Sequence, residues 1–439
     1  MSGDPLGEQA DPVVVPLTAE DRAILALEGA HVVGHTCKVV RLAPGAPDLA
    51  ALRDAVARRL ADAPRLTWRL AGPADAPVWL PDAAVDVAAH VGAVHAATPL
   101  DPAGLRQEVA RLFVQRLDRS RPLWRMDLVG PLAGGGAALV WRVHHALADG
   151  TTAMRLAQDV LWDAPTAPAP RAAPAVPAPR AAHAPGDPPG SETPRHDLAG
   201  VLSGELLPGL RRSPFDARVG RDRAVALATA PLPALHDAAS ALAGATVNDA
   251  VLAVVAGALR RWLEHRHGPL RRLRVKVPVT LHPAGDAAGN RDSWFRVDLP
   301  VDEPDVGVRL AAVRTETALR KTRHDAQELD ELMARLARAS PRLAHWSQRL
   351  QRSGRAFALN VSNVRGPTGP VSVLGARVDT LHSLAEVGRH HALRVAVVSV
   401  ADRLCFGLVA DPAVVEDVDV LAGAVETEAA ELVRAGTPS

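Results

Sequence analysis

Aromatic residues are scarce in this chain of 439 residues, which has no tyrosine, five phenylalanines and eight tryptophans. Proteins that bind single-stranded nucleic acid stack the bases on aromatic side chains and add a positively charged groove. The formal net charge of this chain is only +1, so no strong positive field attracts phosphates. The composition therefore predicts that nucleic acid is not a partner.

Cysteine is also rare, since the chain has only Cys37 and Cys405. One distant pair matches neither a zinc-binding spacing nor a disulfide framework, which indicates a reducing compartment. Both thiols are expected to be buried as small apolar side chains. The N-terminus lacks the pattern of a signal peptide, and no apolar run approaches the length of a membrane span. We expect a cytoplasmic protein, for which peripheral contact with a membrane stays open.

Proline and alanine dominate residues 164–194, where apolar periodicity is absent. Such a composition is typical of an extended crossover. It predicts a first lobe over 1–163, a linker over 164–198 and a second lobe over 199–439. Helical and strand patterns alternate in both lobes, which favours the α/β class. The patterns predict helices over 17–29, 48–64, 104–117, 151–163 and 246–266, and strands that include 35–42, 271–281, 293–301 and 357–364. In the first of these helices we expect Thr18 at the N-cap and Asp21 at the third helical position.

The stretch VHHALADGTT at residues 143–152 carries the strongest sign of chemistry. His144 and His145 end an apolar strand pattern, and Asp149-Gly150 directly precedes a helical one. Adjacent side chains on a strand point to opposite faces, which argues against both imidazoles binding one metal ion. No further ligand stands at a familiar spacing nearby, so we expect no metal. A fixed imidazole titrates near working pH and suits a general base.

The acidic and glycine positions of this motif have supporting roles in the same interpretation. Asp149 would orient the base directly or hold the loop through an arginine. Gly150 would permit a backbone conformation that other residues avoid.

The pattern His-His-x-x-x-Asp-Gly is identified as the signature of the CoA-dependent acyltransferase superfamily, which includes chloramphenicol acetyltransferase, carnitine acyltransferases and condensation domains. The longer stretch 117–150 resembles the bacterial wax ester synthase/diacylglycerol acyltransferase family. Further segments resemble the same family in chain order, namely PLTAEDRAILALE at 16–28, PVWLPDAAVDVAAHV at 77–91, Asn248-Asp249, VKVPVTLHPAGDAAGNRDSWFRVDLP at 275–300 and NVSNVRGPTGPVSVLGARV at 360–378.

The resemblance implies a fold, a reaction and a set of site residues. The fold has two chloramphenicol-acetyltransferase-like lobes, each a mixed sheet with helices, and a tunnel between them. His145 would be the base that deprotonates an acceptor alcohol, which attacks the thioester of acyl-CoA directly. His144, Asp149 and Gly150 would support it, and Ser362 would donate to the oxyanion. The implied substrate-binding residues are Asn248, Asp249, Asn363, Gly366 and Pro367.

This mechanism needs no enzyme nucleophile, in agreement with the lack of a G-x-S-x-G elbow in the sequence. The predicted function is therefore O-acyl transfer from acyl-CoA, a substrate rather than a resident cofactor, to a long-chain alcohol or diacylglycerol. The product would be a wax ester or triacylglycerol.

Alternatives stay open for several of these residues and for the substrates. Ser362 would equally suit a strand end, and Asn248 and Asp249 would suit the N-cap and first turn of a helix. The arginine-rich segment 332–355 would be either a membrane-surface helix or a solvated helix face. Rival functions are a tailoring or condensation-type enzyme that uses CoA or a carrier protein, and a catalytically idle lipid-binding scaffold at a lipid droplet.

Overall fold

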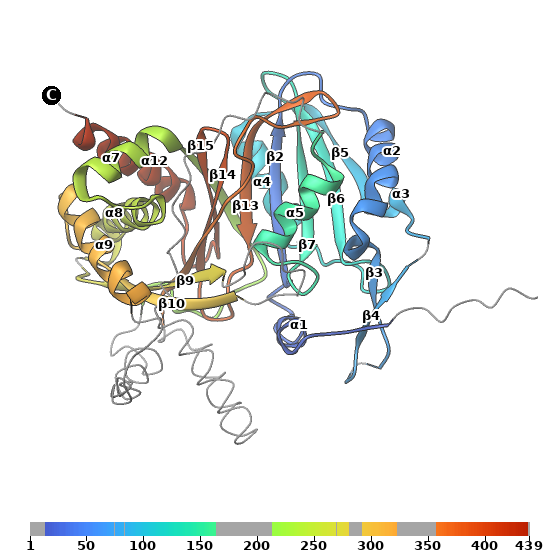
Figure 1. Ribbon diagram of the computed structural model, residues 1–439, viewed down its shortest axis with the longest axis horizontal. Coiled ribbons are helices and arrows are strands. Elements are labelled where there is room, and N and C mark those ends of the chain that lie inside the picture. The colour runs from blue at the N-terminus through green and yellow to red at the C-terminus, as the bar shows by residue number, and fades with distance from the viewer. Residues whose placement is uncertain are drawn as a thin grey trace, which may run out of the picture.

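Two six-stranded sheets form the two lobes of the protein (Figure 1). This computed structural model describes residues 14–73, 75–82, 84–163, 213–268, 270–280, 292–322 and 357–437. The predicted linker at 164–198 and the arginine-rich segment at 332–355 lie outside the described residues. The pair of sheet-rich lobes confirms the predicted fold class.

The first sheet has the strand order β12-β13-β2-β7-β6-β5. Its central strand β7 is buried along its whole length, because α2 and α5 pack on one face of the sheet and α4 on the other. A small sheet, β1-β4-β3, adjoins it. The elements of this lobe are β1 (Val15–Pro16), α1 (Ala19–Leu25), β2 (His35–Leu42), α2 (Leu49–Arg59), η1 (Leu60–Asp62), η2 (Pro64–Thr67), β3 (Trp68–Ala71), β4 (Val78–Pro81), α3 (Val87–His90), β5 (Val91–Leu100), α4 (Pro102–Phe113), β6 (Trp124–Leu132), β7 (Ala137–His144) and α5 (Gly150–Val160).

The second sheet has the order β10-β9-β11-β14-β15-β8. Helices α7, α8, α9 and α12 cover the face that lies away from the first lobe (Figure 1). The other face packs toward the first lobe, where Val398, Val400 and Val409 join the cores of that lobe. The elements are β8 (Ala224–Pro231), α7 (Leu232–Ala243), α8 (Val247–His267), β9 (Leu273–Thr280), β10 (Asp292–Leu299), α9 (Val306–Thr322), β11 (Leu359–Val364), β12 (Ser372–Val373), β13 (Ala376–Ala385), β14 (Leu393–Val400), β15 (Arg403–Ala410) and α12 (Val418–Gly436).

One excursion of the chain links the lobes. After β11 in the second sheet, the chain crosses to the first sheet, where β13 pairs antiparallel with β2 from Val378 opposite Leu42 to Ala385 opposite Thr36. It then returns to the second sheet as β14. The sequence pattern assigned all of 199–439 to the second lobe and did not reveal this exchange. The proposed boundaries themselves remain a prediction.

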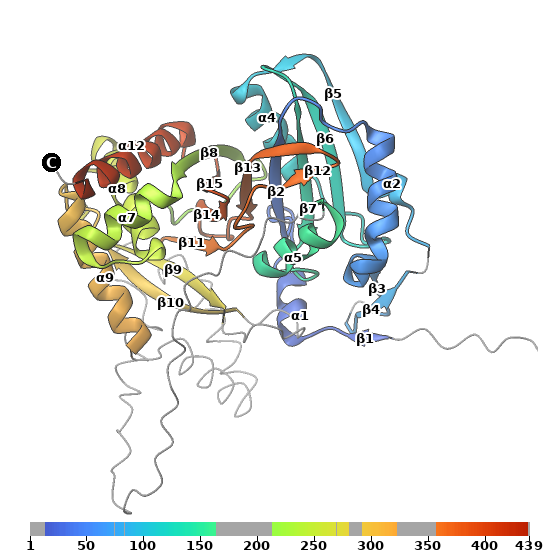
Figure 2. The same cartoon turned by 45° about the horizontal axis from the view of Figure 1, so that its top comes forward.

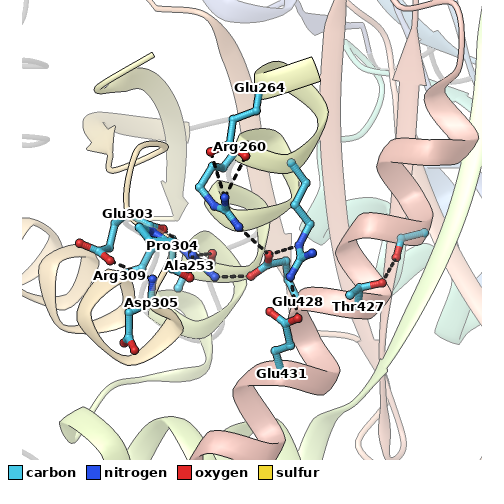
Figure 3. Close-up of polar contacts among 12 residues, drawn as sticks. Ala253, Arg260, Glu264, Glu303, Pro304, Asp305, Arg309, Thr427, Glu428 and Glu431 are labelled. Atoms are coloured by element: carbon cyan, nitrogen blue, oxygen red, sulfur yellow. Dashed lines mark hydrogen bonds and ion pairs between the residues drawn. The ribbon is translucent and has the colours of Figure 1, made fainter. Parts of the chain in front are cut away.

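A buried ionic network holds the helices of the second lobe together (Figure 3). Glu428 on α12 and Arg309 on α9 are fully buried and form an ion pair. Glu428 also accepts from Arg261 on α8 at 2.5 Å, and Arg309 donates to the carbonyl of Ala253 at 3.1 Å. Three helices therefore depend on one carboxylate, whose burial is acceptable only because it is paired.

Several local predictions agree with the structure. The capping box of Thr18 and Asp21 begins α1, and both cysteines are buried.

Among the described helices, no single one is long and apolar enough to cross a bilayer. The bent pair of α7 and α8, which meet at 92°, passes the same test by length and composition together.

Candidate active site

The histidine pair lies where β7 ends. His144 is the last residue of β7 and pairs with His35 on β2, and the backbone N–H of His145 donates to the carbonyl of Gly34 at 2.9 Å. His144 is 1% exposed, whereas His145 is half-buried. The two rings therefore have different environments, and His145 is the one with access to solvent.

His144 is held in one orientation by its neighbours. Its Nδ1 accepts from the backbone N–H of Ala146 at 3.1 Å, so in the neutral ring the hydrogen is on Nε2. That Nε2 lies 3.3 Å from Oε1 of Glu28, which also pairs with Arg119. Burial acts to raise the pKa of Glu28, but His144 and Arg119 outweigh it and the pKa is lowered. His144 has the contacts of a supporting residue.

Position 34, beside the contact between His144 and Glu28, requires glycine because of its backbone conformation and the lack of space for a side chain. Its φ is +71°, in the left-handed region that favours glycine. A Cβ at this position would lie 2.7 Å from Nε2 of His144 and 2.8 Å from Cγ of Glu28. Any side chain would therefore displace the partner of His144.

His145 is uncharged at neutral pH. Burial, the largest cause, and Arg394 on β14 together lower its pKa to about 4, although Asp149 acts in the opposite direction. The imidazole is consequently neutral at pH 7, which is the form a general base needs. Arg394 comes from the second lobe, so the electrostatic environment of the base depends on both lobes.

Asp149 and Gly150 begin the helix that follows the motif. Asp149 is 3% exposed and is the N-cap of α5, where its Oδ1 accepts from the N–H of Thr152 at 2.6 Å. Gly150 is the first residue of α5, so the expected special backbone conformation is wrong. A Cβ on Gly150 would lie 3.1 Å from Cγ2 of Val364. Close approach of the second lobe explains this glycine instead.

Ser362 lies on β11, on the face that turns toward the motif. Leu359 and Val361 point into the core under the helices of the second lobe, so Ser362 and Val364 point the other way. Val364 packs against the first lobe and approaches Gly150. The strand therefore presents Ser362 toward the first lobe, whereas its role as an oxyanion donor remains a prediction.

The residues that follow Ser362 are used in backbone contacts. Asn363 alternates to the opposite face of β11 from Ser362. The N–H of Gly366 donates to Oγ of Ser399 at 3.2 Å, and the carbonyl of Pro367 accepts from the N–H of Ala401 at 2.9 Å. These bonds attach the end of β11 to the end of β14. A role in substrate binding for Asn363, Gly366 and Pro367 stays a prediction.

Asn248 and Asp249 lie in the first turn of α8. The expectation that Asn248 is the N-cap is wrong, because Thr246 caps the helix and forms a capping box with Asp249. Asp249 is 2% exposed and accepts from Oγ1 of Thr317 on α9 at 2.6 Å. Asp249 is thus in the first turn, as predicted, and joins α8 to α9. The substrate-binding role of the pair remains a prediction.

Three neighbours of the motif were not found from the sequence. Besides Glu28 and Arg394, Nε of Arg65 donates to the carbonyl of Leu147, inside the motif, at 2.5 Å. These side chains come from separate segments of the chain, and no spacing connects them to the motif. Within the described residues, no group of three or more histidine, cysteine, aspartate or glutamate side chains is placed to hold a metal ion.

The arrangement of the two lobes is shared with condensation domains. The first condensation domain of the calcium-dependent antibiotic synthetase superposes with a TM-score of 0.59 at 18% identity, covering 97% of this chain and 98% of that chain. The starter condensation domain of rhizomide synthetase gives 0.56 at 15% identity, over 93% and 94%. The protein therefore has the two-lobed fold of these condensation domains.

The chain belongs to the wax ester synthase/diacylglycerol acyltransferase family. The catalytic-domain model of this family matches residues 17–204, and its C-terminal-domain model matches residues 288–433. The family assignment confirms the resemblance seen in the sequence. It makes the protein an acyl-CoA-dependent O-acyltransferase.

Named members of the family show the extent of the similarity. The wax ester synthase/diacylglycerol acyltransferase from Marinobacter aquaeolei VT8 superposes with a TM-score of 0.71 at 25% identity, over 96% of this chain and 100% of that chain. The probable diacylglycerol O-acyltransferase tgs2 of Mycobacterium tuberculosis is 32% identical over 75% of this chain and 78% of its own length. The probable enzyme tgs1 is 28% identical over 88% and 89%.

Proposed function

We propose that this protein transfers the acyl group of acyl-CoA to the hydroxyl of a long-chain alcohol or diacylglycerol, with His145 as the general base. The observation that carries the proposal is a half-buried, neutral imidazole at a strand end, supported by residues of both lobes. The acceptor class rests on the names of the relatives, which include a probable diacylglycerol O-acyltransferase and a wax ester synthase/diacylglycerol acyltransferase. The product would be a storage lipid, triacylglycerol or wax ester.

In the proposed reaction, His145 takes the proton of the acceptor hydroxyl as its oxygen attacks the thioester carbonyl carbon. The carbonyl oxygen becomes an oxyanion, toward which Ser362 would donate a hydrogen bond. The carbon–sulfur bond then breaks, and the CoA thiolate leaves with the proton held by the imidazolium. His144, Asp149 and Gly150 act by fixing the strand end and the helix that flank the base.

The test is product analysis by mass spectrometry with palmitoyl-CoA and either hexadecanol or dioleoylglycerol. We expect His145→Ala to lower kcat by about 10³-fold, within the range attributed to a general base, and Ser362→Ala to lower it by about 10²-fold. His390→Ala is the matched control. His390 is exposed, and it belongs to a second histidine pair, His390-His391, which is not followed by Asp-Gly. If His145→Ala left acyl transfer unchanged, the proposal would be wrong.

The rival substrates are separated by the same assay. Acyl transfer from a carrier-protein thioester in place of acyl-CoA, together with no product from either lipid acceptor, would favour a tailoring or condensation-type enzyme. Transfer by neither donor would favour a lipid-binding scaffold. Peripheral membrane or lipid-droplet contact is part of the proposal because the acceptors are lipids, and co-flotation with vesicles that contain dioleoylglycerol tests it.

A further inference from the structure

A carboxylate at the end of β13 joins the two lobes beside the motif. β13 lies next to β2 between the lobes (Figure 2), and Glu386 directly follows the last residue of β13. Its Oε1 accepts from Nε of Arg223 at 2.8 Å, and its Oε2 accepts from the backbone N–H of Val33 at 3.2 Å. Arg223 immediately precedes β8 of the second sheet, whereas Val33 lies just before β2 of the first sheet. The side chain of Glu386 therefore bridges the two lobes.

The segment between α1 and β2 carries two supports of the histidine pair. We call residues 26–34 the α1–β2 segment. The carbonyl of Gly34 accepts from the backbone N–H of His145 at 2.9 Å, and Oε1 of Glu28 lies 3.3 Å from Nε2 of His144. A shift of the α1–β2 segment would move both contacts, and with them the imidazole of His145.

The ion pair of Glu386 and Arg223 holds the α1–β2 segment at two points. The N–H of Val33 donates to Glu386, and the carbonyl of His31 accepts from Nη2 of Arg223. Nη1 of the same guanidinium donates to two backbone carbonyls of the stretch before β8, at 3.0 and 2.8 Å. Val33 directly precedes Gly34, so the bond to Glu386 is one residue away from the contact with the base.

Burial makes each partner of this pair depend on the other. Glu386 and Arg223 are 8% and 7% exposed, so solvent screens their interaction little. Burial raises the pKa of Glu386, and Arg223 is the main group that opposes this rise. Removal of either partner would leave a buried charge without compensation. An amide in place of the carboxylate has a single acceptor oxygen, so its NH2 would face either the guanidinium or the N–H of Val33.

A fixed relation between the lobes matters because the proposed reacting groups come from both. His145 follows β7 of the first sheet, and Ser362, the proposed oxyanion donor, lies on β11 of the second. A misplacement of about 1 Å in such an arrangement costs about 100-fold in rate. Glu386 is bonded to the second lobe through Arg223 and to the segment that contacts His145, so it is placed to fix the base relative to the donor.

We propose that Glu386, together with Arg223, is a positioning residue for acyl transfer. The pair fixes the α1–β2 segment against the second lobe and thereby holds His145 in place relative to the groups of that lobe. This inference rests on the proposed function and specifies which residues couple the two lobes in it. Glu386 acts through the backbone of Val33 and Gly34 and does not touch the reacting atoms. The alternative is an ion pair whose loss affects stability alone.

The test uses Glu386→Gln, with Asp163→Asn as the matched control. Asp163 is a carboxylate that acts near the opposite end of β13. It accepts from the backbone N–H groups of Leu374 at 2.9 Å and Gly375 at 2.8 Å, and it pairs with Arg59 at 3.4 Å. The control therefore makes the same chemical change at another carboxylate that binds backbone N–H groups and an arginine, away from the α1–β2 segment.

Kinetics with palmitoyl-CoA and hexadecanol distinguish positioning from stability. We expect Glu386→Gln to lower kcat at least about tenfold while KM changes by less than about twofold, and Arg223→Met to act in the same way. Asp163→Asn should change neither constant. In a His145→Ala background, Glu386→Gln should lower the remaining rate no further, because a residue that acts through the base has no effect once the base is absent.

Hydrogen exchange of the full-length protein measures the positioning without turnover. In Glu386→Gln, the backbone N–H groups of Val33 and His145 should exchange at least about tenfold faster, because the first loses its acceptor and the second depends on the α1–β2 segment. In Asp163→Asn, the faster exchange should instead occur at Leu374 and Gly375. If Glu386→Gln does not fold, Arg223→Met is measured in its place by both methods.

Three results would overturn the inference. They are an equal loss of kcat in Asp163→Asn, an equal further loss in the His145→Ala background, and unchanged exchange at Val33 and His145 in the folded variant. If His145→Ala by itself left acyl transfer unchanged, the proposed function would fail. Hydrogen exchange would then still decide whether Glu386 fixes the α1–β2 segment.

Discussion

Three buried histidines predict that the protein loses stability as the pH falls from 7 to 5. His35, His382 and His391 are 1%, 4% and 4% exposed. Burial is the main cause that lowers their pKa values, to about 3 for His35, about 4 for His382 and about 3 for His391. The folded protein therefore keeps these rings neutral over a pH range in which the unfolded chain protonates them.

The magnitude follows from proton uptake. An unfolded histidine has a pKa of about 6.5, so between pH 7 and 5 the unfolded state takes up nearly one proton per ring and the folded state almost none. At about 1.4 kcal/mol per proton and pH unit, each histidine removes about 2 kcal/mol from the free energy of unfolding. The three together remove about 6 kcal/mol, a large part of the roughly 5–15 kcal/mol of a typical protein. This stability is complete above about pH 6.5 and is lost as the pH falls toward the folded pKa values.

Denaturant unfolding at pH 7, 6 and 5 measures this effect. His382→Leu should reduce the loss of unfolding free energy between pH 7 and 5 by about 2 kcal/mol, whatever it does to stability at pH 7. His95→Gln, at an exposed position on β5, is the matched control and should leave the pH dependence unchanged. The reasoning is refuted if His382→Leu has the same pH dependence as the parent, or if the parent is equally stable at pH 5 and 7.

Three further predictions concern the supports of the site and the second lobe. Gly34→Ala should lower the free energy of unfolding by about 2–4 kcal/mol, because of left-handed strain and overpacking against His144, and should lower kcat. Thermal unfolding and turnover measure the two effects, and a Tm equal to that of the parent would contradict the prediction. Glu428→Gln should lower the free energy of unfolding by about 3–5 kcal/mol, because it leaves the buried Arg309 without its carboxylate. In the same denaturant assay, the double variant Arg309→Met with Glu428→Leu should recover much of this loss. Asp149→Ala should lower the free energy of unfolding by about 1 kcal/mol through loss of the N-cap, and it should change kcat more than KM. An effect on KM alone would argue against a supporting role for Asp149.

Much of the local structure could be predicted, because caps and periodicity act over a few residues. The expected helix at 246–266 is α8, Val247–His267, and the Thr18 capping box is present. The error at Asn248 has a local cause as well. Two cap-forming residues stand close together, and Thr246 caps the helix because Asp249 completes the reciprocal bond with it.

The environment of the motif could be predicted only in part. The resemblance of the contiguous motif to the superfamily signature identified His145 as the candidate base. It did not identify Glu28 or Arg394, which are 116 or more residues from the motif along the chain. It also gave a wrong reason for Gly150, since contact with Val364 became visible only when the second lobe was in place.

The sequence by itself determined the family, the α/β class and the position of the candidate base, since each is encoded in short stretches of the chain. Only the tertiary structure decided that β13 joins the first sheet and that Val364 on β11 approaches Gly150. The physical reason is register. Strands far apart in sequence bring residues together through hydrogen-bond pairing, and a shift by one residue would turn every side chain to the opposite face.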